Sequence, residues 1–228
     1  MKQHLLPALA GLMAAIACGG CAAGRSVSPR IADNWAASWK VRTGNGHGSG
    51  VVLTEDGYIL TAGHVADSEK LLGISVQDDN GAWTDVPVEL VALDRDKQLA
   101  LLKAERHFSR VAVLGRLAEC LPGDLVYVIG YAYDLEATVG RGYILRRQFD
   151  FTTPGRTVRG AMILDMFSGP GQSGGGIYAE RDGRLIGLVV GNYPLTYPGL
   201  KTYPARWATH VDDIRSFLDQ YGIAYRTE

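Results

Sequence analysis

Cysteine is scarce in this chain of 228 residues, which holds three cysteines. Cys18 and Cys21 lie near the N-terminus, and Cys120 has no obvious disulfide partner. The scarcity excludes a small scaffold that is held together by disulfides, so the fold must depend on a hydrophobic core. Hydrophobic residues make up 46% of the chain, which is enough for such a core.

An excess of charge of either sign is also missing. The chain has 23 Lys and Arg against 24 Asp and Glu, which gives a formal net charge of −1. Arg146 and Arg147 form the one dense pair of basic residues. Because a nucleic-acid interface requires a basic patch, we expect no nucleic-acid partner.

The sequence contains little that could hold a metal. His47, His107 and His210 show no paired spacing with Cys, Asp or Glu, so we expect no metal site and read these histidines as solvent-exposed.

No apolar run is long enough to cross a membrane. Lys2 precedes an apolar stretch from Leu5 to Ile16, which is shorter than the roughly 20 residues that a membrane span needs. This pattern predicts a signal peptide over residues 1–23 and a place outside the cytoplasm, in the periplasm or cell envelope, or secreted.

The end of that stretch resembles a bacterial lipobox, in which small residues precede a cysteine that is lipidated and becomes the new N-terminus. Cys18 and Cys21 both fit, and lipidation of either would anchor the protein to a membrane. The alternative is ordinary cleavage near Ala22 or Ala23, which leaves a soluble protein. The sequence leaves both alternatives open.

Short apolar runs separated by Gly, Asp or Asn predict an all-β fold. They come in two sets, which suggests two barrels or a sandwich. The runs are 50–53, 58–62, 71–76, 86–93 and 99–103, then 125–129, 138–145, 161–166, 176–180 and 185–190. We expect a polar linker over residues 24–34 before the first run. After the last run, apolar residues recur every three or four positions from Val211 to Tyr221, which predicts a closing helix capped by Thr209.

Ser173 lies in the most informative stretch, Gly171 to Gly176. Glycines around a serine permit a sharp turn that exposes both its Oγ and nearby N–H groups. A nucleophile and an oxyanion hole could therefore coincide here. His64 follows the apolar run 58–62 at a turn, which makes it the candidate general base.

These segments occur in a recognisable order. The segments are 48–53, the His64 segment, 94–103, 122–130 and the Ser173 segment. Together they resemble the trypsin-like (chymotrypsin-fold) serine protease family, and within it the bacterial HtrA/Deg protease domain. The resemblance covers residues 48–190. It implies a protease domain over 35–228, built from two six-stranded antiparallel β-barrels at about 35–115 and 116–228, with a C-terminal α-helix.

The resemblance also implies a mechanism. His64 would take the proton of Ser173, which attacks a peptide carbonyl and forms an acyl-enzyme that water releases. The backbone N–H groups of Gly171 and Ser173 would form the oxyanion hole. The chain would then be a serine endopeptidase that acts on polypeptides and needs no cofactor.

One position departs from the family pattern. The family has an Asp directly before the segment that corresponds to Leu99–Lys103, and this chain has Gln98. The amide oxygen of Gln98 could accept the Nδ1–H of His64 but carries no charge. Asp96 shares a face with Gln98 in an extended strand, and a bulge could bring its carboxylate inward. Asp96 and Gln98 both stay candidates, and Asp94 and Asp96 also fit a solvated turn.

The substrate pocket follows from the same resemblance. Residues 167–170, which begin with Phe167, would line one wall, although Phe167 could equally belong to the core. Val189, Val190 and Gly191 would form the edge that pairs with the substrate backbone. No acidic residue stands where trypsin-like enzymes select Arg or Lys, so we expect a small or medium apolar substrate side chain.

Two other functions compete with this one. Gly171–Gly175 fits the nucleophile elbow of an α/β-hydrolase esterase, with Asp182 and His210 as partners, although glycines after the serine start a helix poorly. The second rival is a pseudoprotease with weak or lost catalysis that binds extended peptides at a strand edge. The oligomeric state is not defined by the sequence.

Overall fold

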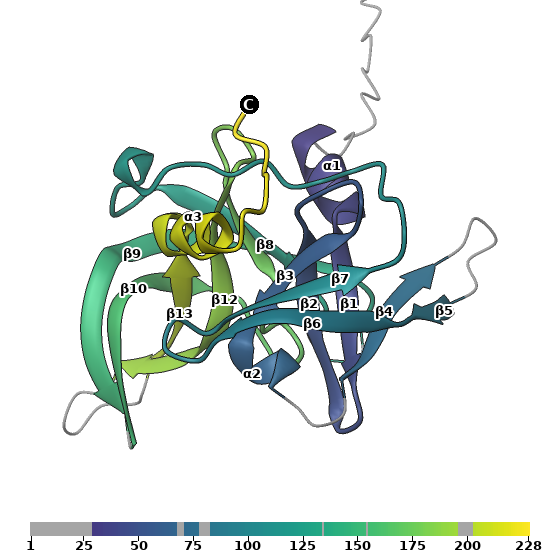
Figure 1. The fold of residues 1–228 in the computed structure, drawn as a ribbon. Helices are drawn as coiled ribbons and strands as arrows, with labels where there is room; N and C mark the ends of the chain where they lie inside the picture. Colours follow the sequence, from purple (N-terminus) through teal and green to yellow (C-terminus); the bar gives the residue numbers. More distant parts are fainter. Residues whose placement is uncertain (1–28, 68–70, 78–82, 134, 154, 196–202) are drawn as a thin grey trace, which may run out of the picture.

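The computed structural model describes residues 29–67, 71–77, 83–133, 135–153, 155–195 and 203–228. In these ranges the chain is mostly β-structure, arranged as two adjoining sheets with the C-terminal helix packed on the second (Figure 1). The all-β fold class and the closing helix are thereby confirmed.

Within the described ranges, the first sheet contains seven strands. Their order is β5-β4-β1-β2-β3-β7-β6, and neighbours are antiparallel. The strands are β1 (Ser38–Thr43), β2 (Gly46–Val52), β3 (Tyr58–Ala62), β4 (Leu71–Gln77), β5 (Trp83–Val86), β6 (Val88–Asp94) and β7 (Leu99–Ala104).

The prediction of a closed six-stranded first barrel needs correction. The two edge strands, β5 and β6, are consecutive in the chain and are separated by Pro87, and no ladder joins them in the described ranges. Proline has no N–H and interrupts a strand. One extended segment therefore becomes two short strands, of which β5 pairs with β4 and β6 pairs with β7.

The second sheet is the closed barrel that was predicted. Its strands follow the order β10-β13-β12-β11-β8-β9. They are β8 (Leu125–Gly130), β9 (Thr138–Thr153), β10 (Arg156–Met166), β11 (Gly176–Ala179), β12 (Leu185–Leu195) and β13 (Tyr203–His210). A 3-10 turn, η1 (Leu117–Glu119), lies on the connection between the two sheets.

The hydrophobic core joins the two sheets. On β7, Leu99 and Leu101 belong to a cluster that continues into the second barrel, whereas Ala100 and Leu102 belong to the inner cluster of the first sheet. Successive residues of a strand point to opposite faces, so a strand with both faces buried requires an unbroken apolar run. The unbroken run 99–102 is explained in this way. The free thiol of Cys120 is also fully buried in this shared core.

Residues 29–34 are not part of a linker. They belong to helix α1 (Pro29–Ala36), and the amide of Asn34 donates hydrogen bonds of 2.8 Å to Tyr127 Oη and to the Gly183 carbonyl. Ile31 and Asn34 are buried. The polar composition of this stretch suggested a linker, but the stretch forms a helix that packs one face on the second barrel.

The closing helix is α3 (Val211–Gln220), and its N-cap is His210 instead of Thr209. His210 Nδ1 accepts a hydrogen bond of 3.3 Å from the Asp213 N–H. The expectation that His210 is solvent-exposed is wrong, because only 4% of its surface is accessible. Desolvation lowers the pKa of the His210 imidazole, against the opposing effect of Asp213.

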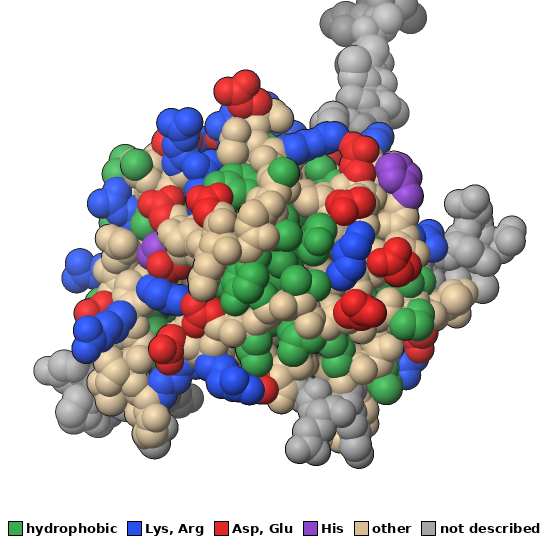
Figure 2. Space-filling view, viewed as in Figure 1, with side chains coloured by type: hydrophobic (Ala, Val, Ile, Leu, Met, Phe, Trp, Pro, Cys, Tyr) green, Lys and Arg blue, Asp and Glu red, His purple; other side chains and the backbone are tan. Residues whose placement is uncertain are grey.

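Within the described residues, the structure contains no helix that is both apolar enough and long enough to span a membrane. Basic and acidic side chains are interspersed over the face that carries α3 (Figure 2). The predicted signal peptide and the lipidation candidates Cys18 and Cys21 lie outside the described residues.

Candidate active site

His64 is presented by a short helix at the end of a buried strand. β3 ends at Ala62, and α2 (Gly63–Ala66) follows directly, with Val65 and Ala66 buried and His64 exposed. The Gly63 N–H donates to the Gln98 carbonyl at 3.0 Å, and a Cβ on Gly63 would lie 3.1 Å from Gln98 Cα. Glycine at this position therefore permits the close approach that places His64 beside Gln98.

Gln98 is the side chain that contacts the imidazole. Its Oε1 lies 2.9 Å from His64 Nδ1 and accepts the backbone N–H of His64 at 3.2 Å, while its Nε2 donates to the Arg95 carbonyl at 2.9 Å. These two partners fix the orientation of the amide, since an N–H must face an oxygen and a carbonyl must face an NH₂ group. In the neutral imidazole, His64 Nδ1 then carries the proton and Nε2 carries the lone pair.

This tautomer is the one that a general base requires. An acceptor at Nδ1 holds the ring so that Nε2 can take the proton of a nucleophile. Gln98 supplies the orientation but not the negative charge that would stabilise the imidazolium. Gln98 is buried and adopts a left-handed backbone conformation with φ 55°.

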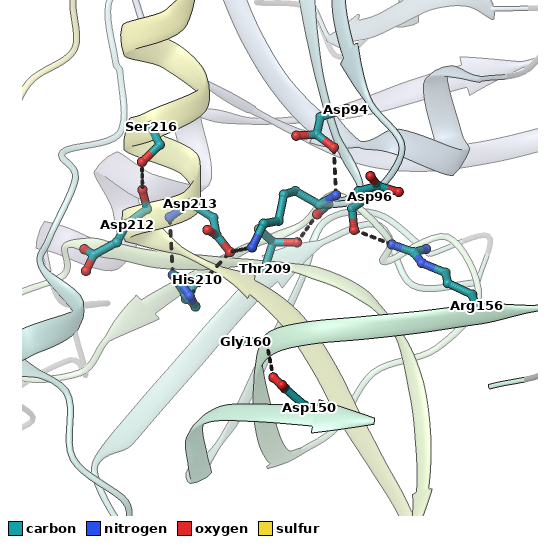
Figure 3. A network of polar contacts seen from close by, with 11 residues as sticks. Asp94, Asp96, Asp150, Arg156, Gly160, Thr209, His210, Asp212, Asp213 and Ser216 are labelled. Atoms are coloured by element: carbon teal, nitrogen blue, oxygen red, sulfur yellow. Dashed lines mark hydrogen bonds and ion pairs between the residues drawn. The ribbon is translucent and has the colours of Figure 1, made fainter. Parts of the chain in front are cut away.

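Asp96 does not turn inward, contrary to one of the two expectations for this position. Its side chain is exposed, and its backbone carbonyl accepts a hydrogen bond of 2.6 Å from Arg156 Nη2 (Figure 3). The left-handed turn at Gln98 directs Gln98 toward His64 and leaves Asp96 on the outer side of the loop. Asp94 Oδ1 accepts the Lys97 N–H at 2.8 Å within the same turn.

Ser173 lies on a loop that the first sheet anchors through Ser49. The Ser49 N–H donates to the Ser173 carbonyl at 2.7 Å, and the Ser49 hydroxyl donates to the Gly171 carbonyl at 2.8 Å. The same hydroxyl accepts the Tyr131 N–H at 2.8 Å, and Thr61 Oγ1 donates to the Ser49 carbonyl at 2.6 Å. One residue of β2 thus ties the Ser173 loop to the sheet that carries His64.

Two glycines of this loop have no room for a side chain. Gly171 and Gly174 have φ of 90° and 85°, in the left-handed region that favours glycine. A Cβ on Gly174 would lie 2.1 Å from the Ser49 carbonyl oxygen, and one on Gly171 would lie 2.2 Å from His47 Nε2. His47 is half-buried, and its Nε2 lies 2.9 Å from the Tyr131 carbonyl, so the reading of His47 as a solvated residue is also wrong.

The backbone N–H groups of Gly171 and Ser173 have no acceptor among the described residues. The intervening and following N–H groups are satisfied, because Gln172 donates to the Gly169 carbonyl at 3.1 Å and Gly174 donates to the Val189 carbonyl at 2.8 Å. Two N–H groups left over beside a serine are what an oxyanion hole provides.

The Ser173 hydroxyl donates to the Val190 carbonyl at 3.1 Å. No hydrogen bond joins Ser173 Oγ to His64 in the described part of the chain. A rotation of the Ser173 side chain would be required before His64 could accept its proton.

A pocket of about 250 Å³ opens beside Ser173. It is lined by Tyr133, Ser168, Gly169, Pro170, Ser173, Val189, Gly191, Asn192 and Arg206. Val189 and Gly191, which were expected at the substrate edge, both line this pocket. Val190 contributes its carbonyl, and its side chain is buried, whereas Phe167 is 54% exposed and does not line the pocket.

Four residues that line the pocket or anchor the Ser173 loop were not predicted from the sequence. Ser49, Tyr133, Asn192 and Arg206 carry no local motif, and they reach the site only through strand pairing and loop packing. Asn192 was reachable in principle, since it directly follows the predicted edge residue Gly191.

Residues 48–188 match the family model of the trypsin-like peptidase domain. The chain belongs to this family. The likeness of the sequence to trypsin-like proteases is therefore confirmed. The esterase alternative is excluded by the all-β fold and by His210, which caps α3.

Relatives of this trypsin-like chain include Protease Do-like 1, chloroplastic, from Arabidopsis thaliana, which is 30% identical over 179 residues. That match covers 77% of this chain and 39% of the relative. The magnetosome formation protease MamE of Paramagnetospirillum magneticum is 32% identical over 147 residues, covering 64% of this chain and 20% of the relative. A probable periplasmic serine endoprotease DegP-like from Halomonas elongata is 30% identical over 141 residues, covering 62% and 28%. The chain thus spans well under half the length of these relatives.

Solved structures show the same fold. Deg5 superimposes with a TM-score of 0.67 at 24% identity, covering 86% of this chain and 94% of Deg5. The HtrA-type protease AlgW, solved with a tripeptide, gives a TM-score of 0.66 at 23% identity, covering 86% of this chain and 64% of AlgW.

Proposed function

We propose that this protein is an exported serine endopeptidase that hydrolyses peptide bonds through a Ser173 acyl-enzyme. The observation that carries the proposal is the contact that orients His64, whose Nδ1 lies 2.9 Å from Gln98 Oε1. Family membership supports protease chemistry, and the unpaired N–H groups of Gly171 and Ser173 supply sites for an oxyanion.

In the proposed reaction, Ser173 Oγ leaves the Val190 carbonyl and donates to His64 Nε2. His64 takes the proton as Oγ bonds to the substrate carbonyl carbon, and the carbonyl oxygen becomes an oxyanion between the Gly171 and Ser173 N–H groups. His64 returns the proton to the leaving amine, which departs. Water, deprotonated by His64, then attacks the acyl carbon, the bond to Ser173 Oγ breaks, and His64 returns the proton to Oγ.

Gln98 takes the third position of the triad in this proposal, and Asp96 has no part in it. Gln98 orients His64 through Nδ1 but leaves the imidazolium without a neighbouring carboxylate. We therefore expect catalysis slower than that of a protease with Asp at this position, because the corresponding loss in trypsin lowers turnover about 10⁴-fold.

The second candidate is a pseudoprotease that binds extended peptides. Two observations favour it: the uncharged Gln98, and the Ser173 hydroxyl that donates to Val190 instead of His64. Both candidates use the pocket beside Ser173, and only the protease requires His64.

Degradation of an unfolded polypeptide distinguishes the two. The purified protein is incubated with denatured casein, and fragments are quantified by mass spectrometry against Ser173→Ala and His64→Ala. The endopeptidase predicts internal cleavage that both variants abolish. Binding of casein without cleavage, at equal affinity in all three proteins, would establish the pseudoprotease.

We also propose that the protein is exported, and that a lipid on Cys18 or Cys21 anchors it to a membrane. The likeness to periplasmic DegP-like proteases supports a place outside the cytoplasm. Mass spectrometry of the N-terminal peptide tests the lipid: an acylated cysteine supports the anchor, and an unmodified N-terminus downstream of Cys21 refutes it.

A further inference from the structure

Gln98 has a backbone conformation that glutamine disfavours. Its φ of 55° lies in the left-handed region, which residues other than glycine seldom adopt. Such a conformation persists only where surrounding contacts hold it. It is also the conformation that turns the Gln98 side chain toward His64. The loop of residues 94–98, here called the Gln98 loop, must therefore be held by its neighbours.

The second barrel holds the two peptide groups that precede Gln98. Arg156 Nη2 donates to the Asp96 carbonyl at 2.6 Å, and Thr209 Oγ1 donates to the Lys97 carbonyl (Figure 3). A peptide group is planar, so the direction of the Lys97 carbonyl also fixes the plane that contains the Gln98 nitrogen. The left-handed turn starts from this plane. Both contacts therefore act on the orientation of Gln98.

Arg156 is itself held in place by an aromatic ring. It is the first residue of β10, at the turn end of the β9–β10 hairpin. Its guanidinium carbon lies over the Trp207 ring, 5.4 Å from the ring centre, where a cation is attracted to the π-electrons. Trp207 is only 9% exposed and packs edge-on against Phe151, with 5.7 Å between the ring centres. The donor to the Gln98 loop is thus attached to a packed part of the barrel.

The same packed group supports the substrate side of the site. Trp207 shares a hydrophobic cluster with Val190, whose carbonyl accepts the Ser173 hydroxyl. A Cβ on Gly191, which lines the pocket beside Ser173, would lie 3.3 Å from Trp207 Nε1. His64 belongs to the first sheet, whereas Ser173 and the pocket belong to the second. A contact from the Trp207 cluster to the Gln98 loop therefore aligns the two halves of the site.

A third contact of the loop contributes less. Lys97 Nζ lies 2.9 Å from Asp213 Oδ2 on α3, but the two side chains are 38% and 20% exposed. Ion pairs that are reached by solvent contribute little. Thr209, by contrast, is buried, and the hydrogen bond of Arg156 is strengthened by its charge. The two carbonyl contacts are the ones that can hold the loop.

We propose that Arg156 and Thr209 are positioning residues of the active site, which hold the Gln98 loop so that Gln98 Oε1 meets His64 Nδ1. Neither residue needs to touch the substrate. Their effect on turnover rests on the proposed endopeptidase function, whereas their effect on the His64 ring does not depend on catalysis.

Nitrogen-15 NMR of the His64 imidazole tests the positioning without a substrate. In the neutral ring one nitrogen carries the proton and the other does not, and their chemical shifts report which is which. The spectrum of His64→Ala assigns the signals. We expect the Nδ1-protonated form in the wild-type protein. In Arg156→Gln we expect a mixture of the two tautomers, because Gln98 is no longer held toward Nδ1.

Two further substitutions control for charge and for chemistry. Arg159→Gln removes the same charge from an exposed position of the same strand, and its His64 signals should match those of the wild-type protein. Arg156→Lys keeps a charged donor and is expected to restore part of the preference for the Nδ1-protonated form. An equal change in Arg159→Gln and Arg156→Gln would overturn the proposal, because the effect would then follow from charge alone.

Thr209→Val tests the second contact, because valine has a similar shape but no hydroxyl. The same mixture of tautomers is expected. Wild-type His64 signals in folded Arg156→Gln and Thr209→Val would overturn the proposal, and if only one of these variants folds, wild-type signals in that variant would do so. A change in one folded variant alone would assign the positioning to that residue and refute it for the other.

Labelling of Ser173 with a fluorophosphonate measures the consequence for the chemistry. We expect Arg156→Gln to slow labelling by about 10- to 100-fold, since a remote misplacement of ~1 Å can lower a rate by about 10². In peptide hydrolysis kcat should fall with little change in KM, because neither Arg156 nor Thr209 is among the described residues that line the pocket.

The two measurements separate the two proposals. If the wild-type protein is not labelled, the endopeptidase is refuted, while the His64 signals still decide the positioning. If the wild-type protein and Arg156→Gln are labelled at equal rates, the claim that this positioning serves catalysis is overturned.

Discussion

The carboxamide of Gln98 accepts the Nδ1 proton of His64 at 2.9 Å, in the place where trypsin-like proteases have a carboxylate. The same oxygen also accepts the His64 backbone N–H, and the amide nitrogen is held by the Arg95 carbonyl. The imidazole is thus oriented by a neutral group. Gln98 fixes the position of the His64 ring but supplies no charge to stabilise the imidazolium. This separation makes the contribution of the missing charge measurable.

Gln98→Asp is expected to raise kcat/KM by about 10-fold or more, because a carboxylate would stabilise the imidazolium that forms during catalysis. Asp also tolerates the left-handed conformation of position 98. Peptide hydrolysis measures the effect. The matched control is Gln98→Asn, which has the shape of Asp but no charge. If the two variants turn over equally, charge at this position does not limit the rate.

Asn34→Ala is expected to lower the free energy of unfolding by about 1–3 kcal/mol, because it leaves the buried Tyr127 hydroxyl and Gly183 carbonyl without their donor. Urea unfolding measures the change. The control is Asp33→Ala on the same helix, which removes an ion pair with Arg110 whose side chains are 58% and 56% exposed. Such a pair contributes less than about 1 kcal/mol. Equal losses in both variants would show that α1 is not docked through Asn34.

His210 is expected to make the protein less stable as the pH falls. Its pKa is lowered by desolvation from 6.5, so between the two values the unfolded chain binds a proton that the folded chain does not. The contribution of the neutral imidazole is complete above pH 6.5 and is lost as the pH falls toward the folded pKa. Protonation would also remove the Nδ1 acceptor that caps α3 through the Asp213 N–H (Figure 3).

Urea midpoints of the wild-type protein and of His210→Asn at pH 7.5 and 5.5 measure this effect. Asn is a good N-cap and does not titrate, so its midpoint should fall less over this interval. A parallel fall in the two proteins would assign the pH dependence to other groups.

The fold was predictable from the sequence because its signals are local. The doubly buried run at 99–102 and the glycines around Ser173 each reflect a constraint that acts within a few residues. Pro87 in the sequence also indicates a break in the strand. Whether the first sheet closes, however, depends on which strands pair with β5 and β6, and these pairings involve distant residues.

The site was predictable only in part, for a physical reason. His64 and Ser173 lie in recognisable turns. The choice between Asp96 and Gln98 depends on the left-handed backbone conformation of Gln98, which directs the Gln98 side chain toward His64. Arg206 reaches the pocket through the pairing of β13 with β12, a contact that no pattern along the chain reveals. The burial of His210 follows equally from packing of α3 on the barrel and not from its neighbours in sequence.

The central claim, that Ser173 is an activated nucleophile despite Gln98, is tested most directly by labelling with a fluorophosphonate probe. We predict a covalent adduct on Ser173 in the purified wild-type protein, located by peptide mass spectrometry, and its loss in both Ser173→Ala and His64→Ala. Absence of the adduct in folded wild-type protein would contradict the claim and favour a protein that binds peptides without cleaving them.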